Sequence, residues 1–281
     1  MSTTPSPTNQ RSRRARVALT LLAVLVPLVP IAIAVALTSG GTPPAASAGV
    51  GTVHLSVVTP PPAVTTPAPA HAHKHARQLP LPPGRGALVA TVARSTTLRA
   101  RPHGRVLARV RPKTPYGSRS TLWVARVSGR WLGVVSPQVG NNRLGWIAAS
   151  AASLARVDWK LRVSLRAKRL TVLHAGRIVK RDTIAVGAPA NPTPTGRFAV
   201  TDRLLTGDPS GPYGCCILAL SAVAPHVIQD WTGGNRIAIH STLETWTIGQ
   251  AISHGCMRLT LAEGRWLIRH VPLGTPTVIR G

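Results

Sequence analysis

The sequence predicts a mostly β protein, in which a membrane segment and a Pro-rich linker precede two small β units. Short runs of alternating apolar and polar residues, separated by Gly and Pro turn signals, occupy the chain from residue 86 onward. The charge is uneven. Residues 1–84 and 85–156 carry six and thirteen basic residues and no acidic one, whereas residues 157–281 carry fifteen basic residues and all seven acidic ones. This division predicts three physical units.

The overall composition excludes several classes of protein. The chain has 281 residues, a net charge of +27, 44% hydrophobic residues and three cysteines. It is too apolar to be wholly disordered and too poor in cysteine to be a disulfide-rich scaffold. The charge indicates a polyanionic partner, which is a nucleic acid, an anionic membrane face or an anionic wall polymer.

Residues 1–16 and 17–37 have the pattern of a basic cytoplasmic tail followed by a membrane segment. Four arginines precede an uncharged apolar run of 21 residues, which is close to the length that spans a bilayer as a helix. An uncleaved transmembrane helix is the favoured interpretation, and a signal peptide cleaved near Ala48 is the alternative. Both place the rest of the chain outside the cytoplasm, so nucleic acid is no longer an expected partner.

Residues 38–84 are predicted to be a disordered linker, because Pro, Ala, Thr and Ser dominate this segment and leave little apolar surface to bury. Residues 85–156 are predicted to be a small β domain. Its expected strands are Ala87–Val92, Thr97–Arg99, Arg105–Val110, Leu122–Val127, Trp131–Val135 and Gly145–Ile147.

Three short segments of this β domain resemble bacterial Src-homology-3-like domains. They are Thr97–Pro102, Gly129–Val134 and Gly145–Ile147. The resemblance implies a small β-barrel of the kind that accompanies wall enzymes. Two roles stay open for it: a basic module that binds the wall, or a structural spacer with a solvated basic surface.

Residues 157–281 are predicted to be a second, mostly β domain that carries the chemistry. Its expected strands are Leu161–Leu165, Leu170–Leu173, Ile178–Val186, a strand entered at Phe198, Ile237–Ile239 and Thr277–Arg280. The segment Thr260–Glu263 has the form of a capping box and predicts a short helix that extends through Leu267.

Cys256 is the candidate nucleophile of this domain. The thiolate is the reactive form of cysteine, and a nearby imidazole, from His240 or His254, can take its proton. Gly255 allows close approach of a substrate carbonyl, and the N–H groups of Gly255 and Cys256 are candidates for an oxyanion hole. Two alternatives stay open: Cys256 as a small buried apolar residue, or Cys256 and the two histidines as zinc ligands.

Two strings around this cysteine resemble the signature of the YkuD-type L,D-transpeptidases. They are His240–Thr242 and Ser253–Arg258, with Trp246–Gly249 between them. The turn Pro192–Phe198 and the segment Gly274–Ile279 are also similar to that family. The resemblance covers residues 157–281 and implies a β-sandwich or barrel with short helices, without a metal or an organic cofactor.

The resemblance implies a cysteine enzyme of the cell envelope whose substrates are peptidoglycan stem peptides. Cys256 attacks the acyl-donor stem, D-alanine leaves, and an amine of a second stem takes the acyl group from a thioester. His240 is the proton acceptor and donor. His254 shapes the site or orients the thiol, and Ser241 fixes His240 through a hydrogen bond.

The same resemblance implies that Arg258 binds a substrate carboxylate, with Ser253 and Trp246 as further substrate-binding residues. The pair Cys215-Cys216 departs from the family pattern. We expect two buried or unpaired thiols there, with a vicinal disulfide as the alternative. Two other functions stay open: a wall-binding protein with an inactive catalytic domain, and a thiol-dependent L,D-carboxypeptidase.

Overall fold

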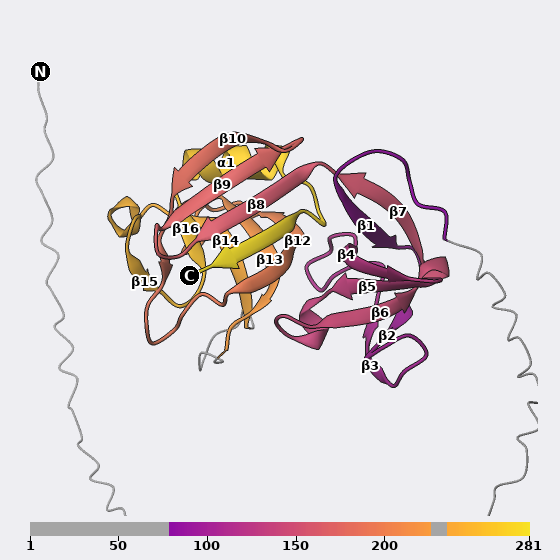
Figure 1. Ribbon diagram of the computed structural model, residues 1–281. Helices are drawn as coiled ribbons and strands as arrows, with labels where there is room; N and C mark the ends of the chain where they lie inside the picture. The colour runs from indigo at the N-terminus through magenta and orange to yellow at the C-terminus, as the bar shows by residue number, and fades with distance from the viewer. Residues whose placement is uncertain (1–78, 226–234) are drawn as a thin grey trace, which may run out of the picture. The chain divides into compact units, whose positions relative to one another are not determined.

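The computed structural model describes residues 79–225 and 235–281 (Figure 1). All of these residues belong to one compact unit, Pro69–Gly281. The expected tail 1–16, the expected membrane segment 17–37 and most of the expected linker lie outside the described residues. In the part of the chain that is described, no helix has both the length and the apolar character needed to cross a membrane.

The first sheet is entirely antiparallel and has the strand order β3-β2-β6-β5-β4-β1-β7. Its strands are β1 (Ala87–Val92), β2 (Thr96–Arg99), β3 (Val106–Val110), β4 (Thr121–Ser128), β5 (Trp131–Val135), β6 (Leu144–Ala148) and β7 (Ala152–Val157). The first six match the expected strands to within a residue or two at each end. Leu98, Leu132, Val134 and Ile147 are fully buried in its core.

The strand β7 was not expected from the sequence. It pairs with the whole length of β1, from Ala87 opposite Val157 to Val92 opposite Ala152. Its residues are mostly small or half-exposed, so the alternation that marks a strand is weak. The strand β7 is therefore defined by its pairing with β1 and not by an apolar–polar pattern of its own.

The second sheet is mixed and has the strand order β10-β9-β8-β17-β12-β13-β14-β16, with a separate pair β11-β15. Its parallel neighbours are β8 with β17 and β14 with β16. The strands are β8 (Trp159–Ser164), β9 (Arg169–His174), β10 (Arg177–Thr183), β11 (Val186–Gly187), β12 (Gly196–Leu205), β13 (Cys216–Val223), β14 (Arg236–Ser241), β15 (Ala251–Ser253), β16 (Met257–Leu259) and β17 (Pro276–Arg280).

The helix α1 (Leu261–His270) is the single α-helix among the described residues, so the expectation of a mostly β protein is confirmed. Its capping box is confirmed as well. Glu263 N–H donates to Thr260 Oγ1 at 3.3 Å, and Thr260 N–H donates to Glu263 Oε2 at 2.8 Å. The helix packs against β13 and β14 through Leu267, which is fully buried.

The strand β13 lies in the middle of the second sheet and was not expected. Five of its eight residues are buried in succession, Leu218 to Ala222. A strand covered on both faces has no alternation of apolar and polar residues, which is why the period-two pattern misses it.

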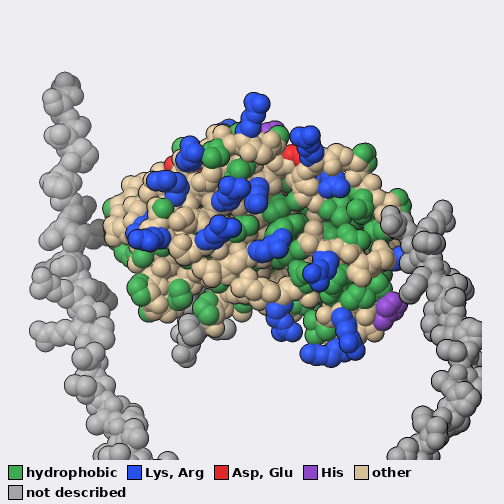
Figure 2. Space-filling model, in the orientation of Figure 1, with side chains coloured by type: hydrophobic (Ala, Val, Ile, Leu, Met, Phe, Trp, Pro, Cys, Tyr) green, Lys and Arg blue, Asp and Glu red, His purple; other side chains and the backbone are tan. Residues whose placement is uncertain are grey.

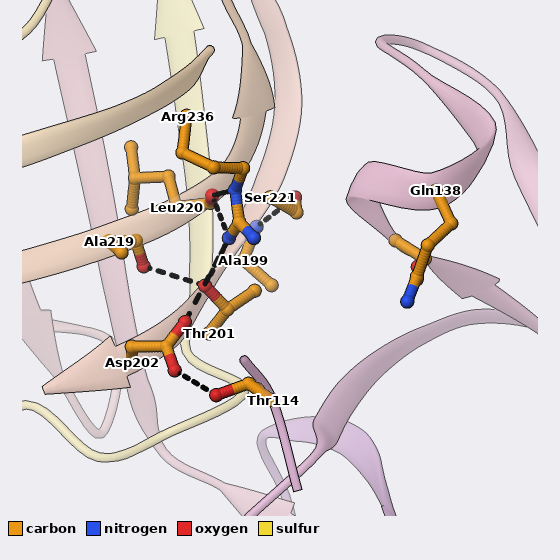
Figure 3. A network of polar contacts seen from close by, with 10 residues as sticks. Thr114, Gln138, Ala199, Thr201, Asp202, Ala219, Leu220, Ser221 and Arg236 are labelled. Atoms are coloured by element: carbon orange, nitrogen blue, oxygen red, sulfur yellow. Dashed lines mark hydrogen bonds and ion pairs between the residues drawn. The ribbon is translucent and has the colours of Figure 1, made fainter. Parts of the chain in front are cut away.

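A buried polar network joins the two sheets (Figure 3). Asp202 in β12 is fully buried, and its carboxylate accepts a hydrogen bond from the hydroxyl of Thr114, in the loop after β3. Arg236 Nη2 lies 4.0 Å from the other carboxylate oxygen, and Arg236 Nε donates to Leu220 O at 2.9 Å. A small apolar cluster of Trp123, Val135 and Ala199 also bridges the sheets.

Candidate active site

Two neighbouring strands of the second sheet bring the predicted nucleophile and base together. In the parallel pair β14-β16, His240 stands in register with Arg258. Cys256 immediately precedes β16, and its Sγ accepts a hydrogen bond from the N–H of Ala238 in β14 at 3.4 Å. Ala238 lies two residues before His240 on the same strand. The thiol therefore lies against the strand that carries the imidazole.

His240 is held as a neutral imidazole. Its side chain is only 4% exposed, and burial lowers its pKa to about 4. The positive charge of Arg258 adds to this shift, whereas backbone hydrogen bonds to Ser241 and Tyr213 oppose it. Nδ1 lies 2.9 Å from Ser241 O, and because a carbonyl only accepts, Nδ1 carries the proton. The basic lone pair is therefore on Nε2.

Cys256 is the free cysteine of the site and is half-buried. Burial raises the pKa of its thiol, although the Ala238 N–H and the charge of Arg258 act in the opposite direction. The thiol is therefore protonated at rest and needs a base before it attacks. A partly exposed cysteine that lies against the strand of a neutral imidazole differs from an inert core cysteine.

Gly255 and Ser253 shape the turn that carries the nucleophile. Gly255 has φ of +109°, and a Cβ at this position would lie 2.9 Å from Cδ1 of Ile237, so both the conformation and the space require glycine. The Gly255 N–H donates to Ser253 Oγ at 3.1 Å, and Ser253 Oγ donates to Cys256 O. The Gly255 N–H is therefore engaged within the turn, which leaves the Cys256 N–H as the candidate oxyanion donor.

Thr193 contacts the candidate site, and the sequence reasoning did not assign it there. Its buried hydroxyl donates to Gly255 O at 2.8 Å and accepts from Gly187 N–H at 2.9 Å. It thereby fastens the nucleophile turn to β11. The only sequence signal was its place within the turn Pro192–Phe198, which indicated a rigid corner and no contact.

Ser241 fixes His240 as expected, but through its backbone. The carbonyl of Ser241 accepts from the ring, while its hydroxyl accepts from the Cys216 N–H at 3.1 Å. The side chain is fully buried and lies 3.4 Å from Cys215 Sγ. The Ser241 hydroxyl therefore makes its contacts in the buried region near Cys215 and Cys216, on the opposite side of β14 from the His240 side chain.

The residues Cys215 and Cys216 form a vicinal disulfide, so the expectation of unpaired thiols is wrong. Both are buried, at the point where the turn Gly211–Gly214 enters β13. Both cysteines are shielded from solvent and lie beside Ser241. If they were unpaired, two weakly polar thiols would be buried at this point.

Arg258 extends from β16 beside both reacting groups, since its charge lowers the pKa of His240 and of Cys256. Its Nη1 pairs with Glu244 Oε2 at 2.7 Å. Its Nε is buried and has no hydrogen-bond partner among the residues the structure describes. A donor in this state is suited to an anionic group that enters the site.

Tyr213 is a second residue that the sequence reasoning did not assign to the site. Its ring packs edge-on against the His240 ring, with centroids 5.0 Å apart. Burial, followed by the charge of the Cys256 thiolate, raises its pKa to about 12. The phenol therefore remains neutral and covers the imidazole from the side of the turn Gly211–Gly214.

Two expected site residues lie at the surface. The side chain of His254 is exposed and borders a shallow hollow with Asn191 and Pro192. Trp246 is 64% exposed, and its backbone carbonyl accepts a hydrogen bond from Gln250 Nε2 at 2.7 Å. Across residues 79–225 and 235–281, no three His, Cys, Asp or Glu side chains converge as metal ligands, including the proposed zinc set.

Residues 158–279 match the family model of the L,D-transpeptidase catalytic domain, YkuD. The YkuD protein of Bacillus subtilis strain 168 is 33% identical over 123 residues, which are 44% of this chain and 66% of that protein. The YqjB protein of the same organism is 26% identical over 127 residues, 42% of this chain and 68% of that protein. The chain thus spans just under two thirds of the length of the first of these relatives.

Solved structures with similarity include an L,D-transpeptidase of Enterococcus faecium. It is 22% identical, with a TM-score of 0.35 over 44% of this chain and 50% of that one. Another, from Mycobacterium smegmatis, is 15% identical, with a TM-score of 0.37 over 68% of this chain and 99% of that one. The family-model match therefore places the similarity to the YkuD-type L,D-transpeptidase catalytic domain in residues 158–279.

Proposed function

We propose that the protein is a cysteine-dependent peptidoglycan L,D-transpeptidase. The observation that carries this proposal is the pairing of a protonated, half-buried Cys256 thiol with a buried, neutral His240 whose Nδ1 is fixed by a backbone carbonyl. This pair has the two properties that nucleophilic acyl transfer needs, a thiol and an adjacent general base with a defined tautomer. The family match of residues 158–279 supports the choice of substrate.

In the acylation half, Cys256 Sγ attacks the carbonyl carbon of the third residue of the donor stem, and the thiol proton passes to His240 Nε2. The Cys256 N–H stabilises the oxyanion of the tetrahedral intermediate. The intermediate then collapses: the C–N bond to the terminal D-alanine breaks, and His240 returns the proton to the departing amine. A thioester remains on the enzyme.

In the transfer half, the amine of a second stem attacks the thioester carbonyl and loses a proton to His240 Nε2. The C–S bond breaks, an amide forms between the two stems, and the sulfur regains its proton from the imidazole. Water in place of the amine would give hydrolysis, the carboxypeptidase outcome. The buried, unpartnered Nε of Arg258 is the proposed contact for a carboxylate of the stem.

We further propose the organisation in which this domain works. Residues 17–37 anchor the chain in the cytoplasmic membrane, or are removed near Ala48, and residues 38–84 are a linker that holds the folded part in the cell envelope. Residues 85–156 are a Src-homology-3-like module and residues 157–281 the catalytic domain. A reporter fused after residue 40 tests the export: activity in the cytoplasm would overturn it.

The central test is intact-mass spectrometry of the full chain after incubation with a tetrapeptide stem. We expect an adduct that equals the stem minus D-alanine, which disappears when an acceptor amine is added and a cross-linked dimer appears. The Cys256→Ala variant serves as the negative control, and Cys215→Ala/Cys216→Ala as the matched control that keeps the nucleophile. A chain that is folded and binds stem but never forms the adduct would support an inactive wall-binding domain instead.

A further inference from the structure

A large basic groove lies apart from the active site, between the first sheet and the outer face of the second. Its volume is about 1270 Å³, and its lining comes from both sheets. Five cations border it: Arg85, Lys160, Arg162, Arg197 and Arg280. Neither Cys256 nor His240 lines it, so its chemistry belongs to a different site.

These cations are not neutralised by the protein. Asp158 is the single acidic residue in the lining, and none of the five cations forms an ion pair within the described residues. Partial burial lowers the pKa of Lys160, and the charges of Arg162, Arg197 and Arg280 lower it further. The groove therefore keeps like charges close together, an arrangement that a bound anion would stabilise.

The topology of the sheet explains why the cations gather there. In β8, Leu161 and Val163 point into the core, so Lys160 and Arg162 point outward. The adjacent strand β17 has Arg280 opposite Ser164, and β12 presents Arg197 opposite Val278. Three neighbouring strands thus project cations from one face.

The basic track continues beyond the groove. A second hollow of about 590 Å³ shares Lys160, Arg162 and Arg280 with the first and adds Arg169 of β9. Figure 2 shows basic side chains spread across this face, whereas acidic ones are visible only near its upper edge. The positive surface is therefore elongated, as a linear ligand requires.

The groove also has an aromatic ring in its lining. The guanidinium of Arg197 lies 4.7 Å from the centroid of the Trp123 ring, which fixes its direction. A rigid aromatic face beside a cation suits a ligand that carries anionic groups on a carbon framework.

We propose that this groove binds a flexible linear polyanion, with phosphate or carboxylate groups repeated along its chain, and so fixes the protein to an anionic polymer. The binding uses no residue of the active site, so it can fail or hold independently of the proposed transpeptidase activity. Because the contacts are charge-assisted and partly solvated, the affinity should fall as the salt concentration rises.

The test uses the full chain and two probes, sodium polyphosphate and poly-L-glutamate. Duplex DNA and phosphatidylglycerol vesicles are the comparison ligands, and neutral dextran is the blank. Calorimetry measures the binding of each probe at several salt concentrations to the parent chain and to the groove variant, Arg162→Gln/Arg280→Gln. The matched control is Arg177→Gln/Arg265→Gln, which removes the same charge from exposed positions outside the groove. Thermal unfolding of both variants checks that they remain folded.

We expect the groove variant to bind at least one probe about tenfold more weakly or worse, with a flatter dependence on salt, and the control to change by less than about twofold. The probe that shows this difference identifies phosphate or carboxylate as the recognised group. Equal weakening in both variants would mean diffuse charge attraction and would overturn the proposal. So would no binding of either probe, or a preference for duplex DNA or phosphatidylglycerol vesicles over both.

Discussion

Cys256 and His240, the two side chains of the proposed reaction, are both held in their uncharged forms, and burial is the common cause. A thiol with a raised pKa and an imidazole with a pKa of about 4 do not exchange a proton at rest. In the proposed mechanism, charge is separated only when the sulfur attacks a carbonyl, and the Cys256 N–H then stabilises the negative charge on the oxygen. The site thereby resists idle oxidation of a standing thiolate.

The low pKa of His240 predicts a loss of stability in acid. Below pH 6.5, the unfolded chain takes up a proton on this imidazole that the folded chain refuses until about pH 4. The unfolded state then binds more protons, so the free energy of unfolding falls as the pH falls through this window, by about 3 kcal/mol in full. Urea unfolding at a series of pH values measures this dependence.

The His240→Gln variant is the control for that measurement, because carboxylates also titrate in acid. Glutamine removes the titrating ring and keeps a polar side chain. We expect the variant to lose less stability between neutral and acid pH than the parent chain. Parallel pH profiles for the two proteins would show that His240 is not the source of the effect.

At the scale of elements, sequence patterns succeeded where a strand has one wet face and one dry face. The alternation of Lys160, Leu161, Arg162 and Val163 marks β8, whereas β13, buried along most of its length, has no alternation to detect. The motif around Cys256 could be recognised because its residues are close together in the sequence. The contact of Thr193 could not be recognised, because its partner, Gly255, lies 62 residues away along the chain.

The capping box of α1 predicts a measurable contribution to stability. Thr260→Ala removes the hydroxyl that accepts from Glu263 N–H, and we expect it to lower the free energy of unfolding by about 1 kcal/mol. Thr260→Ser keeps the hydroxyl and should cost only a few tenths of that amount. Urea unfolding compares them, and an equal loss in both variants would point to the lost methyl group instead.

At the scale of the whole folded part, two sheets with separate cores meet across a few polar contacts and one small apolar cluster. Arg236 belongs to this junction and is also the first residue of β14, the strand that carries His240. The junction and the active site therefore share one strand. Asp202 therefore contacts, through Arg236, the strand that carries His240.

The hydrogen bond between Thr114 and Asp202 can be tested by a double-mutant cycle. Thr114→Val deprives a buried carboxylate of a donor, and we expect a cost of about 1–3 kcal/mol in the free energy of unfolding. In the Asp202→Asn background the same change should cost less, with a coupling of about 1 kcal/mol. Thr195→Val, at an exposed site, is the control, and additive effects would argue against the bond.

The vicinal disulfide has a practical consequence for anyone who handles this protein. With Cys215 and Cys216 joined, Cys256 is the one thiol that an alkylating reagent can reach in a chain of three cysteines. The native protein should therefore take up one equivalent of iodoacetamide without a reductant, and three after reduction and unfolding. A dye or an affinity tag can be placed on Sγ of Cys256, with no need to engineer the chain.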